Sequence, residues 1–247
     1  MSPDALMPDR SRVLAPRPGL LVWATCTALA MLAVNLAVFD APALAGLPAL
    51  LLFAAGVLFL WLQLPAHYPH ARFGSCNGVT LLRAGLGASL LTPLLSGDAA
   101  QAAWGGWAVA LVALFALSLD GVDGWLARRQ GLTSGFGARF DMEIDAALAL
   151  ILALHAFADG MGGIMVLTLG VTRYVFVAAS WGLPWMAAPL PDKFGRKVVC
   201  VIQIAALIAL QVPILESGLA LGITWVAVAA LMWSFGRDIL WLWRHRS

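Results

Sequence analysis

Acidic residues are concentrated in one stretch of this sequence, where they could do chemistry together. Five of the thirteen lie in the segment from 120 to 145: Asp120, Asp123, Asp141, Glu143 and Asp145. Like charges this close repel one another, so such a cluster destabilises a fold unless a positive group lies among the carboxylates. The sequence therefore predicts a site that attracts cations.

The spacing of the aspartates predicts how they meet. Asp120 and Asp123 are three residues apart, and Asp141 and Asp145 are four apart. In helices each pair lies on one face, with Cβ atoms about 5 to 6 Å apart. The short polar segment between the pairs would fold the second helix back against the first, so that four carboxylates converge. Glu143 lies off the face of Asp141 and Asp145 and is interpreted as a solvated charge.

The surrounding residues indicate a ligand for this cluster. Oxygen ligands with no His or Cys nearby suit Mg²⁺, Mn²⁺ or Ca²⁺ rather than Zn²⁺. Gly124 and Gly137 let a phosphate group approach the backbone, as do Gly121 and Gly135, and Arg128 can pair with it. A metal-bridged pyrophosphate is the ligand that this pattern predicts.

The motif resembles that of a known family. The run Asp120-x2-Asp123-Gly124-x2-Ala127-Arg128-x8-Gly137-x3-Asp141-x3-Asp145 is similar, at every fixed position and spacing, to the signature of the CDP-alcohol phosphotransferases, also called CDP-alcohol phosphatidyltransferases. Upstream, Asn77-x2-Thr80-x2-Arg83 resembles the segment that opens the family's membrane core. The similarity extends from Asn77 to the last predicted helix.

The resemblance implies a role for each matched position. Asp120, Asp123 and Asp141 would hold two divalent cations, Mg²⁺ or Mn²⁺, with Asp145 as a further metal ligand and the general base. The residues implied to bind the CDP moiety are Asn77, Thr80, Gly124, Ala127, Arg128 and Gly137. The implied reaction transfers a phosphatidyl group from CDP-diacylglycerol to an alcohol hydroxyl and releases CMP, as a step of phospholipid biosynthesis.

The acceptor alcohol is indicated only by later cations. Arg173, Lys193 and Arg196 resemble cations that bind an acceptor's phosphate in the family, which favours glycerol 3-phosphate or an inositol phosphate. The positive-inside rule also explains loop cations without any substrate. A serine, choline-type, inositol or lipid acceptor stays open, as does a CDP-alcohol donor used with a diacylglycerol acceptor. A different class, an ion-coupled transporter, would use the carboxylates but would have no need for Gly124 and Arg128 at these spacings.

The elements that position these residues must lie in a membrane. Of the 247 residues 62% are hydrophobic and 11% charged, and mean hydropathy is +0.88, whereas soluble domains are about a quarter charged. A net charge of +2 is too small for a nucleic-acid-binding protein. The three cysteines, Cys26, Cys76 and Cys200, are isolated and form neither a disulfide framework nor a metal site.

Eight continuous apolar runs predict an all-α polytopic membrane bundle rather than a barrel. They span 20–38, 47–64, 79–95, 104–119, 141–158, 163–183, 197–215 and 219–242. Residues 1–66 are predicted to form a cytoplasmic tail and two extra N-terminal transmembrane helices. Residues 67–247 are predicted to form the six-helix core that the family resemblance implies.

The distribution of Lys and Arg predicts the orientation. Thirteen of the fifteen lie before the first run, in alternate loops or at the run ends beside them, or near the C-terminal end of the chain, all on one side. The positive-inside rule then places both termini and the acidic cluster at the cytoplasmic face, in a bacterial inner membrane with membrane lipid as a partner. Arg83 and Arg173 fall inside predicted helices, which makes both functional candidates. A homodimer stays open.

Overall fold

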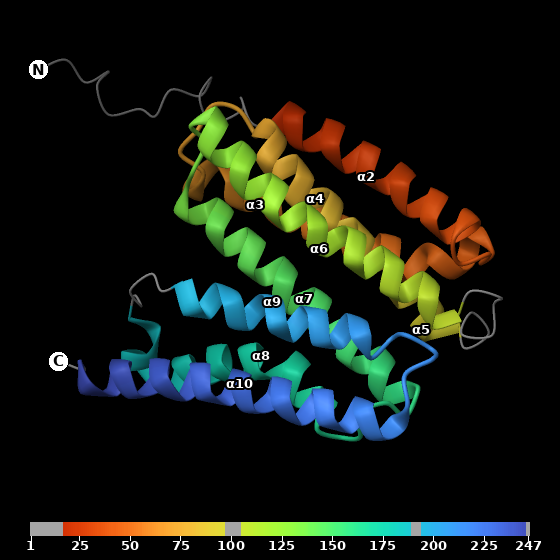
Figure 1. The fold of residues 1–247 in the computed structure, drawn as a ribbon. Coiled ribbons are helices and arrows are strands. Elements are labelled where there is room, and N and C mark those ends of the chain that lie inside the picture. Colours follow the sequence, from red (N-terminus) through yellow and green to blue (C-terminus); the bar gives the residue numbers. More distant parts are fainter. Residues whose placement is uncertain (1–16, 97–104, 189–193, 246–247) are drawn as a thin grey trace, which may run out of the picture. The chain divides into compact units, whose positions relative to one another are not determined.

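The computed structural model describes residues 17–96, 105–188 and 194–245 (Figure 1), and these residues contain helices and turns but no strand. Eight principal helices follow one another: α2 (Arg17–Ala37), α3 (Leu47–His67), α4 (Gly74–Ser89), α6 (Gly105–Gln130), α7 (Gly135–Ala158), α8 (Val166–Gly182), α9 (Phe194–Ala209) and α10 (Ser217–Arg244). The short helix α5 (Leu91–Ser96) follows α4, and the 3₁₀ turns η2 (Ala43–Gly46) and η4 (Pro184–Ala187) precede α3 and follow α8. The predicted all-α fold with eight main helices is confirmed.

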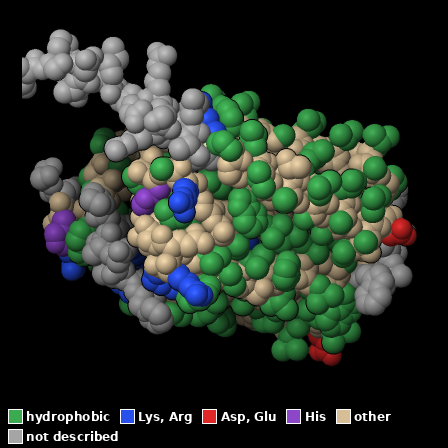
Figure 2. Space-filling model, turned by 90° about the horizontal axis from the view of Figure 1, so that it is seen from above, with side chains coloured by type: hydrophobic (Ala, Val, Ile, Leu, Met, Phe, Trp, Pro, Cys, Tyr) green, Lys and Arg blue, Asp and Glu red, His purple; other side chains and the backbone are tan. Residues whose placement is uncertain are grey.

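Five of the described helical segments are long and apolar enough to cross a membrane. They are α2, α3 with η2, α4 with α5, α6 and α10. Large hydrophobic side chains such as Leu51, Phe59 and Leu62 of α3 are exposed, and Figure 2 shows hydrophobic side chains over most of the visible face. In a lipid environment these side chains face acyl chains at no cost, so the chain is a polytopic membrane helix bundle.

Two helices are longer than the hydropathy pattern predicts. The predicted runs ended at 119 and resumed at 141, whereas α6 continues to Gln130 and α7 begins at Gly135. Only four residues separate them, so the polar segment between the aspartates is itself mostly helical. The acidic residues therefore lie inside the two helices rather than at the ends of the apolar runs. Charged residues lower hydropathy without disfavouring a helix.

The chain divides into two compact units, each described by itself. The first comprises Met1–Ala102 and Phe115–Ile144, and the second Ala103–Leu114 and Asp145–Ser247. Both α6 and α7 begin in one unit and end in the other.

In the first unit, α4 packs against both α2 and α3. The most apolar stretch of α4 with α5 is 72% buried, compared with 22% for α2 and for α3 with η2, so α4 is the inner helix of this unit. Its core is a cluster of apolar side chains: Leu20, Met31, Ala49, Phe53, Leu60, Leu64, Tyr68, Phe73, Leu81 and Ala88.

In the second unit, α10 packs against α8 and α9. Gln211, just after α9, is buried, and its amide nitrogen Nε2 donates to the carbonyl oxygens of Leu152 at 3.0 Å and Leu207 at 2.9 Å. These bonds tie α7 to the end of α9 within the apolar interior, where an unpaired amide would be costly.

Candidate functional site

Local sequence signals close the hairpin that carries the aspartates. Gly131 adopts φ +65 just after α6, and the N–H of Leu132 donates to the carbonyl oxygen of Ala127 at 3.0 Å, as in a glycine-terminated helix end. Ser134 caps α7, because its Oγ accepts from the N–H of Gly137 at 3.0 Å. The two caps fix how α7 leaves α6.

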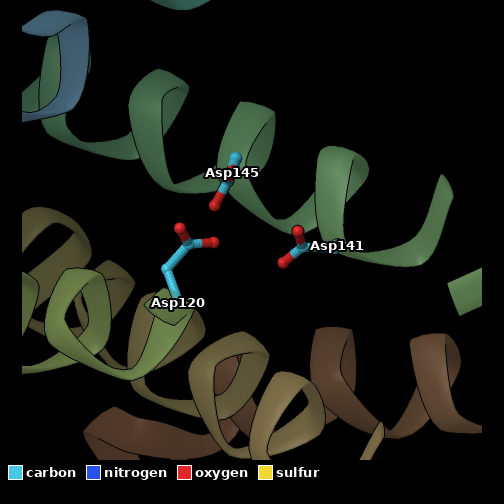
Figure 3. A group of neighbouring side chains, drawn as sticks. All are labelled: Asp120, Asp141 and Asp145. Atoms are coloured by element: carbon cyan, nitrogen blue, oxygen red, sulfur yellow. The ribbon is translucent and has the colours of Figure 1, made fainter. Parts of the chain in front are cut away.

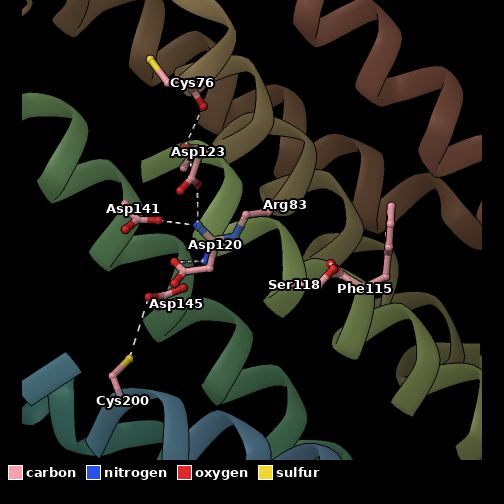
Figure 4. Close-up of polar contacts among 10 residues, drawn as sticks. Cys76, Arg83, Phe115, Ser118, Asp120, Asp123, Asp141, Asp145 and Cys200 are labelled. Carbon is pink, nitrogen blue, oxygen red and sulfur yellow. Dashed lines mark hydrogen bonds and ion pairs between the residues drawn. The ribbon is translucent and has the colours of Figure 1, made fainter. Parts of the chain in front are cut away.

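A buried arginine lies among the acidic side chains. Arg83 of α4 is only 1% exposed. Its Nη2 lies 3.0 Å from Asp120 Oδ1, and its Nη1 donates to Asp123 Oδ2 at 2.7 Å and to Asp141 Oδ1. Figure 4 shows the guanidinium between these side chains. Arg83 is therefore the positive group whose presence among the carboxylates the sequence requires.

Three of the four predicted metal ligands come together. One carboxylate oxygen each from Asp120, Asp141 and Asp145 lies within 4.8 Å of the others (Figure 3). Asp145 follows Asp141 by one turn of the unbroken helix α7. The side chains of Asp120 and Asp141 are 32% and 36% exposed, so they remain accessible to an ion. Hard, partly accessible oxygen donors fit a cation such as Mg²⁺ or Mn²⁺.

The fourth predicted ligand has a different environment. Asp123 is 5% exposed, and its Oδ2 accepts from Arg83 and from the hydroxyl of Thr80 at 2.9 Å. Thr80 was predicted to bind the CDP moiety, whereas in the structure its hydroxyl donates a hydrogen bond to Asp123. Among the described residues, Asp120, Asp141 and Asp145 form the candidate metal cluster.

The start of α4 is held by a network that the sequence did not reveal. Asn77 Nδ2 donates to Tyr68 Oη at 2.8 Å and to the carbonyl oxygen of Phe73. The Tyr68 hydroxyl donates in turn to the carbonyl oxygen of Arg72 at 2.8 Å. Burial raises the pKa of Tyr68 to about 12, so the phenol stays neutral and remains a donor. A tyrosine nine residues before Asn77 gives no recognisable sequence signal.

The remaining predicted nucleotide-binding residues lie on the hairpin. Gly124 and Ala127 follow Asp120 and Asp123 along one face of α6, and the exposed Arg128 is next to them, because a Cβ added at Gly124 would lie 3.6 Å from Arg128 Nη1. On α7, a Cβ added at Gly137 would lie 3.5 Å from Asn77 Oδ1. The structure thus brings Asn77 and Gly137 together.

The predicted acceptor residues belong to the second unit. Arg196 Nε lies 3.4 Å from Asp238 Oδ2, and Arg237 Nε lies 3.9 Å from Asp238 Oδ1. Asp238 of α10 is 6% exposed and was not predicted as a partner. Arg173 lies half-buried on α8, and Lys193 lies outside the described residues.

A thiol accompanies the predicted base. Cys200 of α9 is partly buried, and its Sγ lies 3.8 Å from Asp145 Oδ2 (Figure 4). Both residues belong to the second unit. The distance allows a weak S–H donor contact to the carboxylate.

Comparison with known proteins identifies the motif independently. The family model described as CDP-alcohol phosphatidyltransferase matches residues 73–233. This segment contains every described residue of the predicted site and excludes α2 and α3. The chain has no significant match among curated proteins or solved structures.

The Arg83 contacts generate a prediction about stability. Removing one partner of a buried ionic cluster leaves the other charges uncompensated and costs about 3 to 5 kcal/mol. We expect Arg83→Met to lower the melting temperature of the detergent-purified protein strongly in EDTA, and Mn²⁺ to restore part of it by replacing the lost positive charge. Arg72→Met, at an exposed position, is the control. A variant at Arg83 that melts like the wild type in EDTA would refute the compensating role.

Proposed function

Because the chain belongs to the CDP-alcohol phosphatidyltransferase family, we propose that it transfers a phosphatidyl group from CDP-diacylglycerol to the hydroxyl of a small alcohol and releases CMP. Family membership by itself makes the protein a phosphotransferase of phospholipid biosynthesis, with a CDP-alcohol and an acceptor alcohol as substrates. The observation that carries the finer proposal is the convergence of Asp120, Asp141 and Asp145 within the motif.

We propose that two divalent cations, Mg²⁺ or Mn²⁺, bind at these carboxylates, with Asp123 as a further ligand. Four aspartates and the Arg83 guanidinium together carry three negative charges, and two divalent cations would change this to one positive charge. Such a centre attracts a diphosphate, whereas the carboxylates alone would repel it. When bound, the cations neutralise the diphosphate and stabilise charge on the leaving oxygen.

The nucleotide is proposed to lie along α6 and the start of α7. Gly124 and Ala127 have little or no side chain, which lets a diphosphate approach the helix, and the exposed Arg128 can donate two parallel hydrogen bonds to it. Asn77 and Gly137 flank this face. Thr80 acts through Asp123, which its hydroxyl holds in place.

Asp145 is proposed as the general base. Its carboxylate takes the proton from the acceptor hydroxyl as the acceptor oxygen forms a bond to the lipid-bearing phosphorus. The bond between that phosphorus and the CMP oxygen breaks, and CMP leaves with the bonding electrons. The product is a phosphodiester between the lipid and the acceptor.

The central experiment measures CMP release. Purified protein with CDP-diacylglycerol and Mn²⁺ is tested against glycerol 3-phosphate, inositol phosphate, inositol, serine, choline and a lipid alcohol. We expect release with at least one acceptor, loss of release in EDTA because the carboxylates then repel the diphosphate, and recovery with Mg²⁺ or Mn²⁺. Full activity in EDTA would refute the metal requirement. If no acceptor gave CMP release, CDP-diacylglycerol would be refuted as the donor.

Substitution of the base tests its role separately. Asp145→Asn keeps the side-chain shape but cannot accept the proton, so turnover should fall by about 10² to 10⁴-fold. Binding of CDP-diacylglycerol, measured by equilibrium titration in the presence of Mn²⁺, should change little. Glu143→Gln is the matched control on the same helix. Near-wild-type turnover of the Asp145 variant would exclude this base.

A phosphorylated acceptor such as glycerol 3-phosphate is proposed, bound by Arg173 and Arg196 with Lys193. Arg196 contacts the buried Asp238 through Nε, which orients its guanidinium and limits its rotamers. A bidentate guanidinium recognises phosphate better than an ammonium does. An arginine held in this way favours a phosphate-bearing acceptor over a neutral one.

Replacing Arg173 tests the acceptor class. Arg173→Lys keeps the charge but removes the planar fork, so the KM for glycerol 3-phosphate should rise about tenfold, while the KM for CDP-diacylglycerol stays unchanged. Steady-state kinetics with each substrate varied in turn measures both values. An equal rise in both, or a loss of protein yield alone, would identify Arg173 as structural and favour a neutral or zwitterionic alcohol.

The one-sided Lys and Arg distribution supports an inner-membrane protein whose catalytic hairpin faces the cytoplasm. A cysteine placed at Thr133, in the α6–α7 turn, should react with an impermeant maleimide only after cells are opened. Reaction in intact cells would contradict this orientation.

A further inference from the structure

The first helix of the described chain lies outside the segment that the family model matches. That segment begins at residue 73, whereas α2 spans Arg17–Ala37 and packs against α4 more extensively than against any other helix. The buried residues of α2 are Leu20, Thr27, Met31 and Asn35. Their spacing of seven, four and four residues forms one stripe along the helix, so α2 has a single face that is used for packing.

Two glycines of α4 contact this face of α2. A Cβ added at Gly78 would lie 2.1 Å from the ring of Trp23, and one added at Gly85 would lie 2.2 Å from Thr27 Cγ2. Neither distance is possible between real atoms, so the approach of α2 requires glycine at both positions. Small residues seven apart let two membrane helices pack closely along two turns.

The opposite face of α4 carries the residues that hold the site. At about 100° per residue, Gly78 and Gly85 point to one side of the helix and Thr80 and Arg83 to the other, roughly half a turn away. Thr80 and Arg83 both contact Asp123. The depth at which α4 packs against α2 therefore sets where these two side chains meet the carboxylates.

We propose that α2 is a positioning element of the active site, acting through α4. Trp23 and Thr27 fill the surfaces over Gly78 and Gly85 and so hold Thr80 and Arg83 against Asp123. The N-terminal helix thereby belongs to the working enzyme rather than serving as an additional anchor. The effect on catalysis rests on the function proposed above, whereas the effect on the position of α4 does not.

A native cysteine reports on the position of α4 without any activity assay. Cys76 lies on the same side of the helix as Thr80 and is 4% exposed. In a Cys26→Ser, Cys200→Ser background, maleimide reacts with Cys76 alone. Gly85→Ala should accelerate this reaction about tenfold, since overpacking displaces the helix. In the otherwise unaltered chain the same substitution should lower CMP release about tenfold.

Compensation distinguishes a direct contact from general damage. Thr27→Ala removes the methyl group that an alanine at 85 would strike, so the Gly85→Ala, Thr27→Ala double variant should regain both the slow labelling and the turnover. Gly78→Ala, facing Trp23, should repeat the effect of Gly85→Ala. Gly56→Ala is the control, because nothing lies within 4 Å of an added Cβ there.

Each outcome decides the proposal. Unchanged CMP release in Gly85→Ala despite faster labelling, or a double variant that recovers neither property, would overturn it. If the wild type releases no CMP, the proposed function fails on its own. Turnover is then replaced by the rise in melting temperature that Mn²⁺ binding at the carboxylates should cause in the wild type. Loss of this rise in Gly85→Ala, with recovery in the double variant, would support the positioning role. An unchanged rise in Gly85→Ala would overturn it.

Discussion

The first unit depends on one interaction, the contact of a buried guanidinium with three carboxylates. Arg83 is almost wholly buried and reaches Asp120, Asp123 and Asp141 from a different helix. In a medium of low dielectric constant an unpaired arginine is costly, and so are clustered acids. Each makes the other tolerable, which requires α4 to lie beside the hairpin of α6 and α7. The inner position of α4 follows from this requirement as much as from its apolar residues.

The same interaction defines what the site can bind. One guanidinium cannot neutralise four aspartates, so the remaining negative charge favours cations at the partly exposed Asp120 and Asp141. Asp123 is buried, and its Oδ2 accepts hydrogen bonds from Arg83 and from Thr80. The cluster therefore has a buried side, where the protein's own donors bind one oxygen of Asp123, and an accessible side. This division explains how carboxylates can stabilise the fold and still serve a ligand.

The sequence predicts the motif and the helices well, because both depend on local order along the chain. It predicts less well what depends on contacts between distant residues. The hydropathy pattern placed the end of α6 and the start of α7 too far from the turn between them, although Gly131 and Ser134 are recognisable capping residues. Arg83 is recognisable in the sequence as a charge within an apolar run, but its partners are distant, with Asp123 40 residues and Asp141 58 residues further along the chain. Tyr68 and Asp238 gave no signal at all, since only packing shows that they are buried beside Asn77 and Arg196.

The boundary of the family match and the boundary of the supporting structure differ for a physical reason. A family motif records residues that meet the substrate, whereas the position of those residues depends on whatever packs behind them. Behind α4 lies α2, in contact through glycines that leave no space for another side chain. Helix packing in lipid relies on such close fit because burial of apolar surface contributes little there. Two glycines on the outer side of α4 are therefore as much a condition for the Arg83 contacts as the aspartates on its inner side.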